Sequence, residues 1–167
     1  LYPGNAITDK TPELIEACKV SLLDRGFGQK SGANGSGWGK ANKVNLWARA
    51  KDGNRAYSML RELINKNIAP NLWDFHPPYQ MDGNCGYTSG VCEMLCYSSD
   101  DIIELLPALP EEWKNGSVKG LCARGGYSLD FTWENGEIKS LSVYSSCGKK
   151  TARIKTGDEI KTVKTVG

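Results

Sequence analysis

The chain has 167 residues, enough for one ordinary domain or two small ones. Its 21 basic and 19 acidic residues give a formal charge of +2 and are scattered along the chain, which argues against a nucleic-acid or anionic-membrane partner. No apolar run approaches the ~20 residues of a membrane-spanning helix. The chain begins at Leu1 without Met or a signal-peptide pattern, so we expect any targeting segment to be missing or removed.

Helical patterns come first in the chain. The stretch 11–26 predicts a helix with Thr11 as N-cap, Pro12 at the first helical position and Gly26 as the stop. Two more helices are expected at about 39–50 and at 54–67, where apolar residues recur at helical spacing.

A fourth helix is expected at 87–98, with Thr88 or Asn84 as its N-cap. The small residues Ser89 and Gly90 would let a neighbouring helix approach this one closely. Six cysteines are present, and we expect them to be buried apolar side chains, with Cys92 and Cys96 on one packed helix face.

The pattern changes at about residue 100 to short β-branched or alternating runs. One of them places Tyr127, Leu129, Phe131 and Trp133 on one face of a strand, and Asn135-Gly136 then predicts a hairpin turn. The sequence therefore predicts an α+β chain in two parts, a helical part (1–98) and a β part (99–167) with about five strands. Because one-sided helices need other helices to cover them, both parts resemble pieces of something larger.

The stretch HPPYQMDGN contains the only histidine of the chain, His76. The prolines after it fix an extended backbone, while Gly83 allows a tight turn and Asn84 can cap the following helix. This arrangement would hold Asp82 just ahead of a helix N-terminus, where a carboxylate could accept a proton from water, and His76 could hydrogen-bond a polar ligand. The neighbouring aromatic residues Trp73, Phe75 and Tyr79 could supply a stacking wall.

On composition alone, a structural role for this loop is favoured. Asp-Gly is an ordinary turn, and a histidine before proline can serve only to tie two loops together.

Several stretches resemble, in order, the carboxy-terminal part of glycoside hydrolase family 95, the α-L-fucosidases acting on α-1,2-linked fucose. They are LYPGNAIT, TPELIEACKVSL, GWGKANKVNLWARAKDGNRAYSMLRELI, NLWDFHPPYQMDGNCGYTSGVCEML and IIELLPALPEEWKNGSVKGLCARGGYSLDFTW. The resemblance implies that the helices are the last of an (α/α)6 catalytic barrel and that a β-sandwich-like domain follows.

The resemblance also implies an inverting mechanism in which Asp82 is the catalytic base. His76, Trp38 and Asn84 are then the expected substrate-binding residues, His76 through fucose hydroxyls and Trp38 through stacking on the sugar. The partners would be a fucosylated oligosaccharide or glycan and the remainder of the parent chain, with no metal and no cofactor. The general-acid glutamate belongs to earlier barrel helices, so Glu62 and Glu93 are expected on helix surfaces or in structural pairs.

The sequence departs from the family pattern at three positions. Gly39 stands where serine is usual, Asn42 where tryptophan is usual, and Cys85 where phenylalanine is usual. The changes at Asn42 and Cys85 keep open a purely structural segment, in a parent whose activity has shifted to another sugar such as α-L-galactose or been lost. A glycan-binding module is a further alternative, and it would need Tyr127, Trp133 or Trp113 exposed on a flat face.

Overall fold

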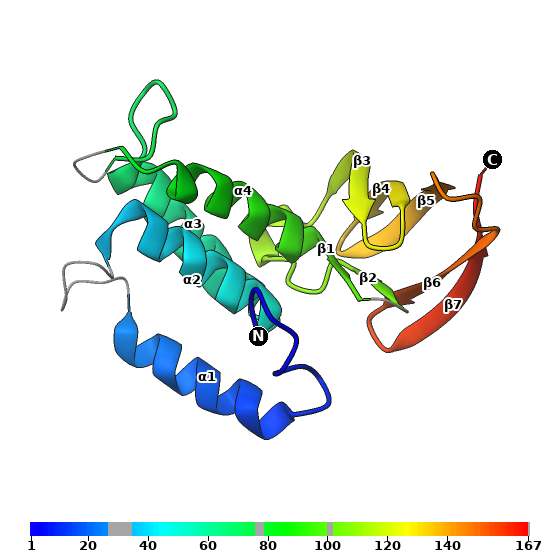
Figure 1. The fold of residues 1–167 in the computed structure, drawn as a ribbon, viewed down its shortest axis with the longest axis horizontal. Coiled ribbons are helices and arrows are strands. Elements are labelled where there is room, and N and C mark those ends of the chain that lie inside the picture. Colours follow the sequence, from blue (N-terminus) through cyan, green and yellow to red (C-terminus); the bar gives the residue numbers. More distant parts are fainter. Residues whose placement is uncertain (27–34, 76–78, 100–101, 167) are drawn as a thin grey trace.

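A computed structural model describes residues 1–26, 35–75, 79–99 and 102–166. Within these ranges the chain forms a layer of helices followed by two small sheets (Figure 1). The helices are α1 (Pro12–Arg25), α2 (Gly37–Arg49), α3 (Gly53–Asn67) and α4 (Met81–Leu95). This order confirms the predicted organisation of helices followed by a β part.

Helix α1 lies at the edge of the helical layer (Figure 1). Pro12 occupies its first turn, and the Gly26 N–H donates to the carbonyls of Leu22 and Leu23, as expected for a helix stop. The Thr11 side chain does not cap the helix and instead donates to the Thr8 carbonyl at 3.0 Å. Only Leu22 of α1 is buried, so most of its apolar surface remains uncovered by the described residues.

Helix α2 is the centre of the helical layer and packs against both α3 and α4 (Figure 1). A Cβ added at Gly90 of α4 would lie 2.5 Å from Val44 Cγ1 of α2, which confirms the predicted close approach of a helix at this glycine. The buried Asn45 side chain of α2 donates to the Gly86 carbonyl of α4 at 2.8 Å and accepts from Ser89 Oγ at 3.0 Å. These contacts fix α4 along α2.

The β part consists of two sheets that share one core. β1 (Cys96–Ser98), β2 (Ile103–Leu105), β6 (Thr151–Thr156) and β7 (Glu159–Lys164) form one sheet in that order, with β2 and β6 parallel. β3 (Gly116–Ala123), β4 (Tyr127–Glu134) and β5 (Glu137–Ser145) form the antiparallel second sheet. Ile103, Leu105 and Ile154 of the first sheet pack with Leu129, Phe131, Trp133 and Val143 of the second. This shared core is that of a β-sandwich.

The β4–β5 hairpin turns at Asn135-Gly136, where both residues have positive φ, 51° and 78°. These values match the turn type that Asn-Gly favours, so the predicted hairpin is confirmed. Leu129, Phe131 and Trp133 are buried on one face of β4, as the alternation predicted.

Two predictions for the region around α4 are wrong. The helix begins at Met81 and ends at Leu95, so neither Thr88 nor Asn84 is its cap, and residues 96–98 form strand β1 instead of the last helical turn.

Cys96 therefore lies on a strand, and it is the only buried cysteine. All six cysteines are free thiols, and Cys122 and Cys147 are exposed, contrary to the predicted burial of these side chains.

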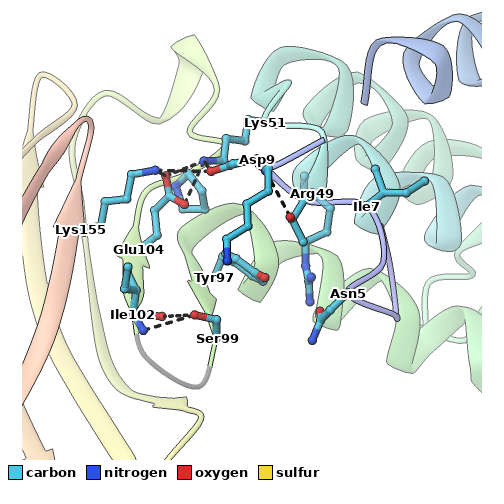
Figure 2. A pocket seen from close by; sticks show the side chains of 14 residues that line it. Asn5, Ile7, Asp9, Arg49, Lys51, Tyr97, Ser99, Ile102, Glu104 and Lys155 are labelled. Carbon is cyan, nitrogen blue, oxygen red and sulfur yellow. Dashed lines mark hydrogen bonds and ion pairs between the residues drawn. The ribbon is translucent and has the colours of Figure 1, made fainter. Parts of the chain in front are cut away.

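A network of four charges joins the helical part to the first sheet (Figure 2). Lys51, just after α2, contacts Asp9 at 2.6 Å and Glu104 of β2 at 2.8 Å. Lys155 of β6 contacts the same two carboxylates at 3.5 and 3.1 Å. Each carboxylate therefore lies between two ammonium groups.

This network makes a pH-dependent contribution to stability. Burial alone would raise the pKa of Asp9, but Lys51 and Lys155 outweigh it and hold that pKa below its ordinary value of 3.8. A carboxyl group whose pKa is lower in the folded than in the unfolded chain stabilises the fold above its unfolded pKa, and this contribution is lost as the pH falls through the folded value. We therefore expect Asp9→Asn to destabilise the fold at pH 7, and we expect the effect to fade below pH 3.8 and vanish only below the lowered pKa of the folded state.

The expected difference at pH 7 is about 0.2–1 kcal/mol, because Asp9 is half exposed and exposed ion pairs contribute little. Urea unfolding of wild type and Asp9→Asn at a series of pH values measures it. Asp158→Asn, which removes an exposed carboxyl in the β6–β7 turn, is the matched control. A difference between wild type and Asp9→Asn that stays constant from pH 7 down through the lowered pKa of folded Asp9 would contradict the expected role of this carboxyl.

Candidate active site

The loop between α3 and α4 carries the residues that the sequence singled out. Two short antiparallel bridges shape it, one between Ile68 and Asp74 and one between Phe75 and Tyr79. The Phe75 N–H donates to the Asn67 carbonyl at 2.8 Å, which ties the loop to the end of α3. His76, the predicted sugar-binding residue, lies outside the described residues.

Asp82 is an exposed residue in the first turn of α4. We expected Asp82 just ahead of the helix, on a turn made by Gly83. The helix instead begins at Met81, the residue before Asp82, with Gln80 as its N-cap. Gly83 is helical and buried, so this glycine does not form the predicted turn. The position nevertheless places the Asp82 carboxyl in water beside the positive end of the α4 dipole.

Asn84 ties the loop to α4. Its Oδ1 accepts from the Asp74 N–H at 2.8 Å, and its Nδ2 donates to the Leu72 carbonyl at 2.7 Å. Sequence reasoning assigned Asn84 to the helix cap and to the substrate. In the structure, both the oxygen and the nitrogen of the Asn84 amide bind the backbone at Leu72 and Asp74, just upstream of His76.

Trp38 lies in the first turn of α2, where Ser36 Oγ caps the helix by accepting from the Gly39 N–H at 3.3 Å. Trp38 is 38% exposed, so its side chain is not buried in the core. Buried Asp74 contacts the starts of both α2 and α4, since a Cβ added at either Gly37 or Gly83 would collide with its carboxylate. Trp38 and Asp82 therefore lie at the same end of the helical layer.

Exposed apolar side chains surround this end. The rings of Trp73 and Tyr79 lie 4.9 Å apart and remain 56% and 41% exposed. Phe75 and Met81 are exposed beside them in the chain. Exposed aromatic faces of this kind suit the apolar faces of a sugar ring, and the stacking wall expected from the sequence stays a prediction.

The other two acidic candidates are structural. Glu93 of α4 pairs with Arg49 of α2 through two hydrogen bonds. Glu62 of α3 contacts Lys66 at 2.9 Å and buried Lys40 at 3.6 Å. Both glutamates therefore lie in ion pairs between or within helices, as expected from the sequence.

The positions that depart from the family pattern differ in their surroundings. Gly39 is buried in the first turn of α2. Asn42 and Cys85 are both exposed, so a tryptophan or phenylalanine there would not enter the core formed by the described residues. Cys85 lies in α4 one turn after Asp82, close enough in sequence to shape the same surface.

Elsewhere, a cavity of about 460 Å³ lies beside the charge network, between the N-terminal segment and the first sheet (Figure 2). Arg49 and Tyr97 line it, with the guanidinium carbon 4.3 Å from the ring centroid. The described residues hold no group of three side chains suited to a metal ion, and none of their helices is long and apolar enough to span a membrane.

The three aromatic residues that a glycan-binding module was expected to expose are buried or only partly exposed in the described β part. Trp133 is 5% exposed, and Trp113 and Tyr127 are only partly exposed. The Trp133 indole N–H donates to the Trp113 carbonyl at 2.7 Å, and the Tyr127 hydroxyl donates to the Thr151 carbonyl at 2.8 Å. The side chains of Trp113 and Tyr127 also pack against the core that contains Trp133, so all three serve the fold of the β part.

Comparison with known proteins places these features in a family. Residues 1–95 match the model of the glycosyl hydrolase family 95 catalytic domain, and residues 97–166 match that of the family's C-terminal domain. The chain is 35% identical over 158 residues to alpha-L-fucosidase 2 of Arabidopsis thaliana, covering 87% of this chain and 18% of the relative. It is 33% identical to probable alpha-fucosidase A of Aspergillus oryzae, covering 80% of this chain and 21% of the relative.

A third relative, probable alpha-fucosidase A of Aspergillus niger, is 31% identical over 92% of this chain and 22% of its own length. The chain thus spans about one-fifth of the length of the curated relatives it matches. Since one family model covers the helices and a second covers the strands, the chain belongs to glycoside hydrolase family 95.

Proposed function

We propose that this chain is the carboxy-terminal segment of a glycoside hydrolase that removes terminal α-1,2-linked L-fucosyl residues from glycans with inversion. The observation that carries the proposal is the position of Asp82. Asp82 is an exposed carboxylate at the end of the helical layer where α2 and α4 begin, and exposed aromatic rings lie at the same end. It also lies within the residues that match the family 95 catalytic domain. The names of the fucosidase relatives support L-fucose as the sugar.

In this mechanism Asp82 acts as the general base. A water molecule between the Asp82 carboxylate and the anomeric carbon gives its proton to the carboxylate as it attacks that carbon. A glutamate from the remainder of the parent chain protonates the leaving oxygen on the opposite face. Inverting enzymes separate the two carboxyl groups by roughly 6.5–9.5 Å, which leaves room for the water. The exposure of Asp82 suits this role because water reaches the carboxylate directly.

Three further residues complete the proposed sugar site. Trp38, exposed at the start of α2, stacks on the apolar face of the sugar, and His76 hydrogen-bonds fucose hydroxyls. Asn84 contributes by holding the backbone at Leu72 and Asp74, from which the chain continues to His76. The site uses two carboxyl groups and water, and it needs neither a metal nor a cofactor.

A second candidate is hydrolysis of α-L-galactosides. L-Fucose is L-galactose without the hydroxyl at C6, so a small polar change in the pocket can exchange the two sugars. Cys85 stands one helical turn from Asp82 and is exposed, where the family usually has phenylalanine. A thiol in place of that ring leaves more room beside the base.

The experiment compares the full-length enzyme with the 167-residue chain alone on 2′-fucosyllactose and on the matching L-galactoside. We expect the full-length enzyme to release L-fucose faster than L-galactose. The chain alone should be slower by about 10²–10⁴-fold, because it lacks the general acid. Comparable rates for the chain alone would contradict a segment that supplies only the base, and faster release of L-galactose would favour the second candidate.

A further inference from the structure

Asp74 is a fully buried carboxylate that the proposed mechanism does not use. Its side chain is 0% exposed, whereas Asp82, eight residues later in the chain, is exposed. Charged side chains are almost never fully buried unless their surroundings compensate the charge. The surroundings of Asp74 therefore indicate what this carboxylate does.

The Asp74 carboxylate occupies the space of two missing side chains. A Cβ added at Gly37, the first residue of α2, would lie 1.5 Å from Asp74 Oδ1. A Cβ added at Gly83, in the first turn of α4, would lie 1.4 Å from Asp74 Oδ2. One carboxylate thus rests against the first turns of two helices at once, one oxygen on each, and any side chain at either glycine would displace it.

The charge of Asp74 is compensated at this position. The N-terminus of an α-helix carries roughly half a positive charge from its aligned peptide dipoles, and two such ends meet at the carboxylate. Lys40 of α2 adds a buried ammonium group. Burial lowers the pKa of Lys40, while the negative charges of Glu62 and Asp74 act against that lowering.

The backbone of Asp74 is held as firmly as its side chain. Its N–H donates to Asn84 Oδ1 at 2.8 Å, and its carbonyl accepts from the Gln80 N–H at 3.4 Å. Gln80 is the N-cap of α4, and Asn84 is in the turn after it. Asp74 therefore contacts the start of α4 through both its main chain and its carboxylate.

We propose that Asp74 is a positioning residue of the active site. It fixes the first turn of α4, which carries Asp82, against the first turn of α2, which carries Trp38. Because it is fully buried, Asp74 touches neither the sugar nor the attacking water, and it acts only through the placement of Asp82. This inference rests on the proposed role of Asp82 as the base.

The test is Asp74→Asn in the full-length enzyme. Asparagine has nearly the same shape, but it removes the negative charge and replaces one carboxylate oxygen with an NH₂ donor beside the positive ends of two helix dipoles. We expect the first turn of α4 to shift and kcat to fall by about 10²-fold, since displacements of about 1 Å have effects of that size. KM should change much less than kcat, because the Trp38 and His76 side chains remain.

Two further variants sharpen the test. Gly83→Ala pushes the same carboxylate away from α4, so it should lower kcat similarly, and the double variant with Asp74→Asn should lose less than the product of the two separate losses. Asp52→Asn is the matched control. It makes the same change at the start of α3, where Asp52 Oδ1 accepts from the Arg55 N–H at 3.0 Å, and it should leave kcat within about twofold of wild type.

The outcomes separate this inference from the proposed function. A kcat of Asp74→Asn within about twofold of wild type, with only a lower melting temperature, would overturn the positioning role and leave Asp82 unaffected. If Asp82→Asn is fully active, the proposed base is wrong and the positioning role is lost with it. Should Asp74→Asn fail to fold, Gly37→Ala reaches the same carboxylate from α2, and an unchanged kcat in that folded variant would equally overturn the inference.

Discussion

Asp82→Asn is expected to lower kcat of the full-length enzyme by about 10²–10⁴-fold, the usual contribution of a general base. Asparagine keeps the shape of the side chain but cannot accept the proton of the attacking water. The melting temperature should stay close to that of wild type, because the Asp82 side chain is exposed and makes no ion pair among the described residues. Steady-state rates on 2′-fucosyllactose together with thermal unfolding of both proteins measure these effects.

Asp24→Asn, which removes an exposed carboxyl near the end of α1, is the control and should leave kcat unchanged. A base role also predicts rescue of Asp82→Gly by azide. Azide is already anionic and attacks the anomeric carbon without giving up a proton, so it replaces both the water and its base. An Asp82→Asn enzyme with more than half of the wild-type kcat would refute the assignment.

Trp133→Ala is expected to lower the free energy of unfolding by about 3–5 kcal/mol, the usual loss for a large aromatic residue in a core. Its indole ring packs among both sheets at 5% exposure, with Phe131 at a centroid distance of 5.8 Å. The ring also lies on Gly116 of β3, where an added Cβ would be 2.3 Å from Trp133 Cζ2. Truncation to alanine would leave a cavity lined by side chains of both sheets.

Urea unfolding of the variants measures this loss. Trp133→Phe should recover most of the stability and lack only the hydrogen bond to the Trp113 carbonyl, worth about 1 kcal/mol. Trp73→Ala removes an indole that is 56% exposed, so it should be nearly neutral for stability. If Trp133→Ala instead left stability intact and abolished glycan binding, the β part would be a binding module rather than a packed sandwich.

Local patterns were sufficient to predict much of the fold. The turn at Asn135-Gly136 and the buried face of β4 depend on neighbours in the chain, so alternation and turn chemistry reveal them. Gly90 was also interpreted correctly, because a small residue on a helix predicts close packing whichever helix the partner is. These features need no knowledge of contacts between distant segments.

The start of α4 could not be predicted in this way. An Asp-Gly-Asn run is typical of a turn followed by a cap, yet Gly83 is helical, and a glycine is needed there because the Asp74 carboxylate occupies the place of a side chain. Asn84 likewise serves the loop backbone instead of the cap. In both cases the reason lies in a residue ten or so positions away, brought close only by the fold.

Asp74 itself was missed for the same reason. It stands between Trp73 and Phe75, where no periodic pattern marks it, and Gly37 and Gly83 lie far from each other in the sequence. The one local signal is a charged residue between two large aromatic residues, which is uncommon for an exposed loop. Only the meeting of two helix starts explains why that residue is an acid.

The stereochemistry of hydrolysis tests the proposed inverting mechanism, and with it the base role of Asp82, most directly. Proton NMR of 2′-fucosyllactose hydrolysis by the full-length enzyme identifies the anomer that forms first, before mutarotation mixes the two. Water activated by Asp82 on the face opposite the leaving group predicts β-L-fucose as the first product. Initial release of α-L-fucose would mean retention and would contradict Asp82 as the base of an inverting enzyme.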